Sequence, residues 1–226
     1  SVGFTEVHVG LDNLELSIFS GKDIAVVVNH TSINKEGNHL VDILSKDLSI
    51  SVKVVFAPEH GFKGNLSAGA FFSDITTPDY KIVSLYGKNK KPSLQDLDGI
   101  DIIIFDIQDI GSRYYTYIST LTYVMEAAAD FNIPLIVLDR PNPLGRKIDG
   151  PILDIKYSSF VGMHPIPIRH GMTVGEIALM MNGEGWIKSD NIVDLKVVKI
   201  DGWNKEMGYF SIPPSPNIPN YITSLI

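Results

Sequence analysis

Residues 101–131 read DIIIFDIQDIGSRYYTYISTLTYVMEAAADF, and this stretch decides the fold. Its apolar run, Ile102 to Phe105, does not alternate with polar residues, which is typical of a strand buried on both faces of a parallel sheet. A polar loop from Asp106 to Arg113 follows. Apolar residues then recur at helical spacing, at Tyr114, Ile118, Leu121, Met125 and Ala128. The spacing predicts a helix that buries Tyr114 and leaves Tyr115 off the buried stripe.

The same alternation of apolar runs and helical patterns continues on both sides of this stretch. Further strands are predicted at 24–28, 52–57, 82–86, 134–138 and 195–200, and helices at 11–18, 40–48 and 173–181. Residues 1–10 read as a loose lead-in, and helix 40–48 is expected to point Leu40, Ile43, Leu44 and Leu48 inward. Thr173 and Glu176 form a capping box, so Glu176 is assigned to helix capping. The pattern predicts an α/β fold, Rossmann-like and doubly wound, with a mainly parallel sheet and helices on both faces.

Composition restricts the class of protein. The chain has 226 residues, a formal net charge of -7 and no cysteine. The negative charge argues against a nucleic-acid partner, since phosphate binding requires a basic surface. The lack of cysteine excludes disulfides and a cysteine nucleophile. No apolar run approaches the roughly 20 residues of a membrane helix, and no signal peptide is visible.

A polar residue stands at or just after the end of four predicted strands. These residues are Asn29, Glu59, Asp106 and Asp139. In a parallel sheet with right-handed crossovers these strand ends meet at one edge, where ligands bind in open α/β sheets. The sequence therefore predicts a polar cleft at that edge.

Polar residues after strands also have a purely structural interpretation. Asn29, and Asp109 in the loop after the strand 102–105, suit turns and helix caps as well as they suit function. Glu59 is a poor cap, and a carboxyl held between Phe56 and Phe62 is a candidate general acid because desolvation raises its pKa. The alternative for Glu59 is a structural hydrogen bond to loop amides.

Three arginines are candidate anion clamps, because a guanidinium binds a carboxylate in a bidentate way. They are Arg113, Arg140 and Arg169, and each has a neighbouring Asp as an alternative partner. The histidines have no metal-ligand spacing, and the sequence has no G-x-S-x-G, Walker A or G-x-G-x-x-G motif. No metal and no cofactor are expected. A carboxylate-rich cleft suits the oxocarbenium-like transition state of glycoside cleavage.

Several motifs together resemble one bacterial family, the NamZ-type exo-β-N-acetylmuramidases. They are PEHGF at 58–62, SLYG at 84–87, FDIQDIGSRYYTY at 105–117, DRPNP at 139–143, FVG at 160–162, IRHGMTVGE at 168–176 and PSPNIP at 214–219. The resemblance implies a Rossmann-like domain whose active site lies in a cleft shared with a smaller C-terminal domain. It implies release of N-acetylmuramic acid from the non-reducing end of peptidoglycan fragments, such as a muropeptide or disaccharide.

The resemblance also assigns roles to residues. Glu59 is the residue carried over as catalytic. The motif positions expected to line the cleft are Asp106, Gln108, Arg113, Tyr115, Asp139, Arg140, Asn142 and His170. Asn29, at the end of a predicted strand, and His60, next to Glu59, are also expected to contact the substrate. The lactyl carboxylate of the substrate would be bound by Arg113 or Arg140.

Family members usually continue beyond the PSPNIP motif. We therefore expect a catalytic domain at 1–210 and the Pro-rich start of a smaller C-terminal domain at 211–226, with an exposed interdomain face. Two departures from the family pattern are Lys63, where Arg is usual, and the stretch 75–78. The family resemblance suggests an exported, periplasmic or cell-envelope location.

Three hypotheses follow. The first is a glycosidase with Glu59 as general acid. The second is a non-catalytic module that binds cell-wall sugars. The third is a metal-dependent hydrolase that uses Asp106, Asp109 and a histidine.

Overall fold

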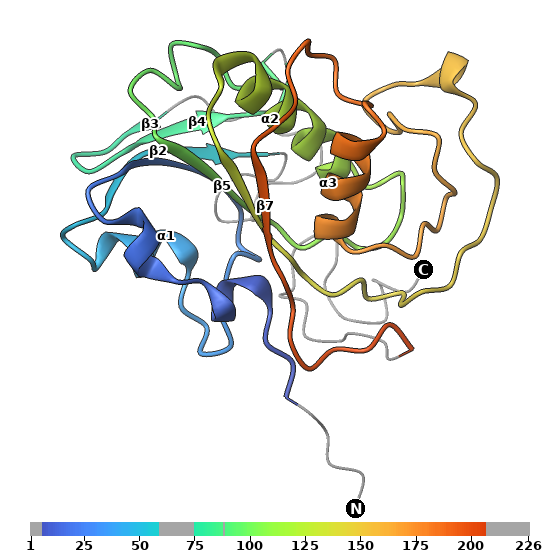
Figure 1. The fold of residues 1–226 in the computed structure, drawn as a ribbon, viewed down its shortest axis with the longest axis horizontal. Coiled ribbons are helices and arrows are strands. Elements are labelled where there is room, and N and C mark those ends of the chain that lie inside the picture. The colour runs from blue at the N-terminus through green and yellow to red at the C-terminus, as the bar shows by residue number, and fades with distance from the viewer. Residues whose placement is uncertain (1–5, 59–74, 88, 207–226) are drawn as a thin grey trace, which may run out of the picture.

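Seven strands form one sheet at the centre of the computed structural model, which describes residues 6–58, 75–87 and 89–206. The strands are β1 (Asp23–Val28), β2 (Ser51–Ala57), β3 (Ile75–Thr76), β4 (Lys81–Ser84), β5 (Ile102–Asp106), β6 (Leu135–Leu138) and β7 (Leu195–Val198). Their order across the sheet is β3-β4-β2-β1-β5-β6-β7 (Figure 1). Every neighbouring pair is parallel except β3 with β4, which is antiparallel at one edge. The predicted mainly parallel sheet is confirmed.

The chain reverses its direction of progress across the sheet between β1 and β5. From β1 it moves outward through β2 to β4, returns to β5 beside β1, and then moves the other way through β6 to β7. Ligands of open α/β sheets bind outside the carboxyl ends of the strands at such a switch point. The ends of β1 and β5 therefore mark the place to look for a site.

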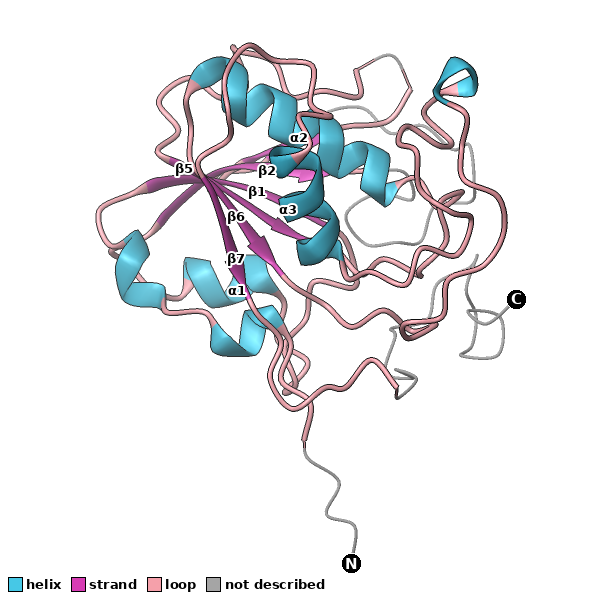
Figure 2. Ribbon diagram, turned by 45° about the vertical axis from the view of Figure 1, so that its right-hand side comes forward, coloured by secondary structure: helices cyan, strands magenta, loops and turns pink. Residues whose placement is uncertain are grey.

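Helices cover both faces of the sheet, as predicted. The α-helices are α1 (Leu40–Ser45), α2 (Tyr117–Phe131) and α3 (Val174–Gly183), and short 3-10 helices lie at Gly10–Asn13, Leu16–Phe19 and Ile155–Tyr157. Figure 2 shows α2 and α3 on one side of the sheet and α1 on the other. The expected capping box is present at the start of α3, where Thr173 and Glu176 cap each other's backbone amides.

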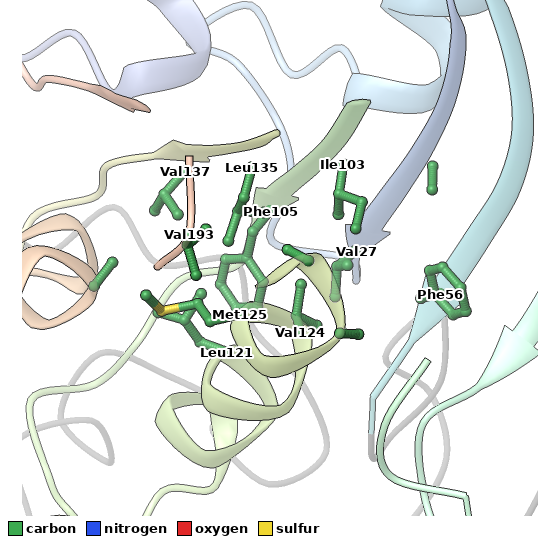
Figure 3. Close-up of a cluster of buried hydrophobic side chains, with 14 of the residues drawn as sticks. Val27, Phe56, Ile103, Phe105, Leu121, Val124, Met125, Leu135, Val137 and Val193 are labelled. Atoms are coloured by element: carbon green, nitrogen blue, oxygen red, sulfur yellow. The ribbon is translucent and has the colours of Figure 1, made fainter. Parts of the chain in front are cut away.

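Strand β5 has an apolar core on each of its faces. Ile103 and Phe105 pack in the cluster that contains α2 and α3, whereas Ile104 belongs to the cluster that contains α1. Figure 3 shows Phe105 against Leu121 and Met125 of α2. Burial on both faces explains why the sequence of β5 is apolar without alternation.

The helix after β5 begins later than the spacing predicts. Residues between Ser112 and Thr116 form turns, and α2 starts at Tyr117. The prediction for the tyrosines is therefore wrong: Tyr114 is 54% exposed, while Tyr115 packs against the core. The turns shift the phase of the helix, so Tyr114 no longer falls on the buried stripe.

Helices on the other face are shorter than predicted. The predicted helix 11–18 consists of two separate 3-10 helices, and α1 ends at Ser45. Leu48 lies beyond that end and is 99% exposed, so its predicted burial is wrong.

The N-terminal segment is not a loose lead-in over its described residues. Val9 is buried, and the Gly10 amide donates a 2.7 Å hydrogen bond to the carbonyl of Asp139. A Cβ at Gly10 would lie 2.4 Å from the Asp139 nitrogen, so only glycine allows this approach. Residues 6–10 are thereby fixed against the end of β6.

Two other features bear on the predicted organisation. The proposed domain boundary at 210/211 lies outside the described residues, so it stays a prediction. Among the described residues, no helix is long and apolar enough to cross a membrane.

Replacing Phe105 with alanine tests the role of β5 as the centre of the core. Phe105 is fully buried, so Phe105→Ala is expected to lower the free energy of unfolding by roughly 3–5 kcal/mol. The exposed Leu48 provides the control, since Leu48→Ala should change it by no more than about 0.5 kcal/mol. Urea unfolding measures both, and equal effects of the two substitutions would contradict the assignment.

Candidate functional site

Polar side chains gather where the central strands end, as the sequence predicts. Asn29 follows β1, Asp106 ends β5 and Asp139 follows β6, and all three are buried. Glu59 and His60 follow β2 in the chain but lie outside the described residues. The described part of this edge is therefore built around β1, β5 and β6.

A buried ion pair joins β5 to the segment after β6. Arg140 donates from Nε to Asp106 Oδ1 at 2.6 Å and from Nη2 to Asp106 Oδ2 at 2.9 Å. Nη2 also donates to the carbonyl of Ile33 at 3.1 Å, which connects the loop after β1 to the same group. Both oxygens of Asp106 are thus bound in a bidentate pair. A direct role of Arg140 as an anion clamp stays a prediction.

The loop after β1 is organised by Asn29. Its Oδ1 accepts hydrogen bonds from the Thr31 amide at 2.8 Å and the Thr31 hydroxyl at 2.6 Å, and its Nδ2 donates to the Tyr117 hydroxyl at 2.9 Å. Such a turn is the structural role that asparagine often plays at a strand end.

Hydrogen bonds also cross the switch point between β1 and β5. The backbone amide of Gln108 donates to Thr31 Oγ1 at 3.0 Å, and the Ser32 hydroxyl donates to the backbone carbonyl of Asp106. The loops after β1 and β5 are therefore bound to each other.

Two side-chain amides hold the neighbouring loops. Gln108 Nε2 donates to the carbonyls of Asp109 and Pro141 at 2.6 and 2.7 Å. Asn142 donates to the carbonyl of Met172 at 2.9 Å and accepts from the Leu144 amide at 2.9 Å. A Cβ at Gly111, where φ is +83°, would lie 2.2 Å from Asn142 Oδ1. These hydrogen bonds from Gln108 and Asn142 thus hold the backbone of the neighbouring loops in place.

Asp139 connects β6 to the N-terminus of α3. Its Oδ1 accepts from the amides of Arg140 and Gly175 at 3.0 and 2.8 Å, and its Oδ2 accepts from the Thr173 hydroxyl at 2.9 Å. Burial nevertheless raises the pKa of this carboxyl to about 6, because desolvation outweighs these hydrogen bonds, and the charge of Glu176 acts in the same direction.

Arg113 anchors the long irregular segment between β6 and α3. Its amide donates to the carbonyl of Ile168 at 2.8 Å, and its Nη1 donates to the carbonyls of Pro151, at 2.9 Å, and Ile166. Within the described chain, its Nε and Nη2 make no hydrogen bond. Arg113 therefore has both a structural attachment and donors that remain for a ligand.

Arg169, the third candidate clamp, lies on the same irregular segment. It pairs with Asp149 through backbone hydrogen bonds, and its Nη2 donates to the carbonyl of Leu144. Its structural contacts are thus with the loop that follows β6.

Asp109 and His170 lie side by side beneath these loops. Asp109 Oδ2 accepts from the Gly111 amide at 2.8 Å and lies 3.3 Å from His170 Nε2. The sequence predicts that His170 contacts the substrate, whereas Asp109 suits a helix cap as well as it suits a functional role. The only sequence signal for Asp109 was its place three residues after a strand end.

The remaining predictions concern an aromatic residue and a metal. Tyr115 is half-buried and contacts Tyr117 edge to face, with ring centroids 4.8 Å apart. Among the described residues, no group of three or more His, Asp or Glu side chains is placed to hold a metal. The suggested set of Asp106, Asp109 and a histidine is not assembled there, because Arg140 binds both oxygens of Asp106.

A groove of about 610 Å³ lies away from these residues. It is lined by Glu126, Ile155, Ser158, Met163, His164, Pro165, Trp186 and Lys188. None of the predicted site residues that the structure describes lines it.

Comparison with known proteins identifies the family. Residues 24–222 match the family model described as "Exo-beta-N-acetylmuramidase NamZ, N-terminal". The chain belongs to this family. The resemblance seen in the sequence motifs is thereby confirmed.

A curated relative from Bacillus subtilis (strain 168) is named "Peptidoglycan beta-N-acetylmuramidase NamZ". It is 42% identical to the chain over an alignment of 233 positions, gaps included, which covers 98% of this chain and 55% of the relative. The chain thus spans little more than half the length of this NamZ protein.

Two crystal structures of DUF1343 family proteins from Bacteroides fragilis NCTC 9343 have the same fold. One gives a TM-score of 0.86 at 36% identity and covers 97% of this chain and 58% of its own. The other gives a TM-score of 0.83 at 42% identity and covers 95% of this chain and 58% of its own. The fold assignment therefore agrees with solved structures of relatives.

The raised pKa of Asp139 predicts a pH-dependent stability. Between about pH 4 and pH 6 the folded state keeps a proton on Asp139 that the unfolded chain has lost, so stability falls as the pH rises. The rise from 3.8 to about 6 corresponds to at most about 3 kcal/mol. Asp139→Asn removes this dependence, so wild type should lose stability relative to the variant between pH 4 and pH 7 in urea unfolding.

Asp47 provides the control, because hydrogen bonds from Ser49 lower the pKa of its exposed carboxyl. The difference between wild type and Asp47→Asn should therefore change in the opposite direction, with wild type losing its advantage as the pH falls. A pH-independent difference for Asp139→Asn would contradict the raised pKa.

Proposed function

We propose that this chain forms the N-terminal part of an exo-β-N-acetylmuramidase, a glycoside hydrolase that releases N-acetylmuramic acid from the non-reducing end of peptidoglycan fragments. The observation that carries the proposal is the 42% identity to a peptidoglycan β-N-acetylmuramidase over 98% of the chain. The substrate would be a muropeptide or a disaccharide derived from peptidoglycan. An exported, periplasmic or cell-envelope location would give the enzyme access to it.

Glu59 is proposed as the general acid. It is the second residue after the end of β2, and β2 pairs with β1 beside the switch point. In the proposed reaction, Glu59 donates a proton to the leaving glycosidic oxygen as the bond to the anomeric carbon breaks. Water supplies the hydroxyl group that ends on the anomeric carbon and the proton that restores Glu59. The buried Asp106 is a weaker candidate for this role, because Arg140 binds both of its oxygens.

Arg113 is proposed to bind the lactyl carboxylate of the substrate. A carboxylate is best bound by two guanidinium N–H groups, and Arg113 has donors at Nε and Nη2 without hydrogen bonds in the described chain. Arg140 uses Nε and Nη2 for Asp106 and Ile33. Between the two arginines that the sequence singled out, the contacts favour Arg113.

A non-catalytic module that binds cell-wall sugars is the alternative function. It is favoured by the internal hydrogen bonds of Asn29, Asp106 and Asp139, since these groups serve the scaffold.

Hydrolysis of a chromogenic β-N-acetylmuraminide separates these functions. The measurement compares this chain, a chain extended to the length of its relatives, and the Glu59→Gln variant of the extended chain. Loss of acid catalysis should lower turnover by roughly 10²- to 10⁴-fold. Glu184→Gln, an exposed substitution at the end of α3, should leave turnover unchanged.

Binding without turnover by the extended wild type would favour the sugar-binding module. Unchanged turnover of Glu59→Gln would reject Glu59 as the acid. A third variant, Arg113→Gln, should weaken binding of N-acetylmuramic acid more than binding of N-acetylglucosamine, which lacks the lactyl group. Equal weakening of both would remove Arg113 from carboxylate recognition.

A further inference from the structure

Two buried polar atoms lie next to each other without a hydrogen-bond partner in the described chain. They are Asp109 Oδ1 and His170 Nε2. The two residues are 4% and 1% exposed, so bulk water does not satisfy them. Buried polar atoms are paired in the great majority of cases, and an unpaired one is costly to the folded state. The pair therefore requires an explanation.

The hydrogen-bond capacity of each atom follows from its neighbours. The Met172 amide donates to His170 Nδ1 at 3.2 Å, so Nδ1 carries no proton. In the neutral ring the proton is then on Nε2, which is a donor. On Asp109, Oδ2 already accepts from the Gly111 amide at 2.8 Å, and Oδ1 remains as an acceptor. The pair presents one donor and one acceptor.

Nε2 and the carboxylate do not satisfy each other. Nε2 lies 3.3 Å from Asp109 Oδ2, yet the two groups are not aligned for a hydrogen bond, so Nε2 stays unpaired. Since Nε2 lies only 3.3 Å from the other oxygen of the same carboxylate, Nε2 and Oδ1 are close enough for one atom to reach both.

To serve both atoms at once, a single ligand atom must accept from Nε2–H and donate to Oδ1. Ammonium and amide nitrogens do not accept, and a carboxylate or carbonyl oxygen has no proton to donate. A hydroxyl oxygen does both. We propose that Asp109 and His170 form a binding site for a hydroxyl oxygen, supplied by a sugar hydroxyl of the substrate or by a resident water.

The position of the pair supports a ligand-binding role. Asp109 follows the end of β5, at the edge where open α/β sheets bind ligands. Gln108 and Asn142 hold the loops on either side of it. The sugar source rests on the proposed function, whereas the water source does not.

The competing explanation is that both side chains only stabilise their own turns. Asp109 accepts from the amide two residues on, and so does His170. These turns use Asp109 Oδ2 and His170 Nδ1 as acceptors, and they do not explain the presence of Asp109 Oδ1 and His170 Nε2. Variants that separate these atoms therefore distinguish the two explanations.

Crystal structures of this chain, ligand-free and soaked with N-acetylmuramic acid, test the site directly. An ordered oxygen within about 2.6–3.2 Å of both atoms in the ligand-free crystal supports a resident water. An oxygen that appears there only as a hydroxyl of the sugar supports substrate recognition. Absence of such an oxygen from both crystals would overturn the proposal.

The protonation state gives a second check. Nitrogen-15 NMR of the His170 ring should show a proton on Nε2 and none on Nδ1, because Nδ1 accepts from the Met172 amide. A proton on Nδ1 would remove the donor on which the site depends and would reject the proposal.

Substitutions of His170 test which ring nitrogen matters. His170→Gln keeps a donor near the place of Nε2, whereas His170→Asn keeps an acceptor near the place of Nδ1. The proposal predicts that His170→Asn is the more damaging of the two, in the urea midpoint for a resident water or in N-acetylmuramic acid affinity for a sugar hydroxyl. The opposite order would show that only the turn matters.

Asp109→Asn tests the acceptor. Its carbonyl oxygen will face the Gly111 amide, so its NH₂ group replaces Oδ1 and the hydroxyl loses its acceptor. Affinity for N-acetylmuramic acid should fall roughly tenfold or more if the hydroxyl belongs to the sugar. If a resident water occupies the site, the ordered oxygen should be lost and the urea midpoint lowered.

Asp47 offers a matched control, because it also accepts from the amide two residues on, in an exposed turn. If Asp109→Asn proves as harmless as Asp47→Asn in both measurements, the hydroxyl site is wrong. Failure of the proposed function looks different: wild type would not bind or hydrolyse muramic acid derivatives, and the ordered oxygen between Asp109 and His170 would be a water in the ligand-free crystal.

Discussion

The buried ion pair between Asp106 and Arg140 is the constraint on which this end of the sheet depends. It joins the end of β5 to the segment after β6, and through the carbonyl of Ile33 it includes the loop after β1. A buried carboxylate is stable only when its charge is paired and its oxygens are hydrogen-bonded, and Arg140 provides both. The loops at the switch point are therefore placed relative to one another by charge as well as by chain connectivity.

The surrounding polar residues extend this scaffold. Asn29 fixes the turn after β1, Asp139 holds the start of α3, and Arg113 binds carbonyls of the irregular segment that crosses the edge. A rigid frame of this kind suits an enzyme of the proposed class, because catalytic groups act best when their supports do not move. The side chains differ in how fully the scaffold uses them: both oxygens of Asp106 are bound by Arg140, whereas Arg113, Asp109 and His170 keep polar atoms without hydrogen bonds in the described chain.

The sequence predicted the fold because local patterns determine it. Strand β5 is apolar on both faces, and polar residues follow the strands where the chain leaves the core. The partners of those polar residues depend on contacts between distant segments, such as Arg140 with Asp106, and no local pattern specifies them. The burial of Tyr114 and Tyr115 is the reverse of the prediction for a local reason, because turns before α2 shift the phase of the helix. Asp109 was ambiguous because a capping aspartate and a ligand-binding one have the same sequence signal.

A double-mutant cycle on Asp106 and Arg140 tests the central claim most directly. We expect Asp106→Ala and Arg140→Ala each to lower the free energy of unfolding by roughly 3–5 kcal/mol, because each leaves an unpaired buried charge. The double variant should cost far less than the sum of the two. Single costs that add to within about 0.5 kcal/mol would show that the two side chains act independently, and would contradict the role of this ion pair in holding the sheet edge together.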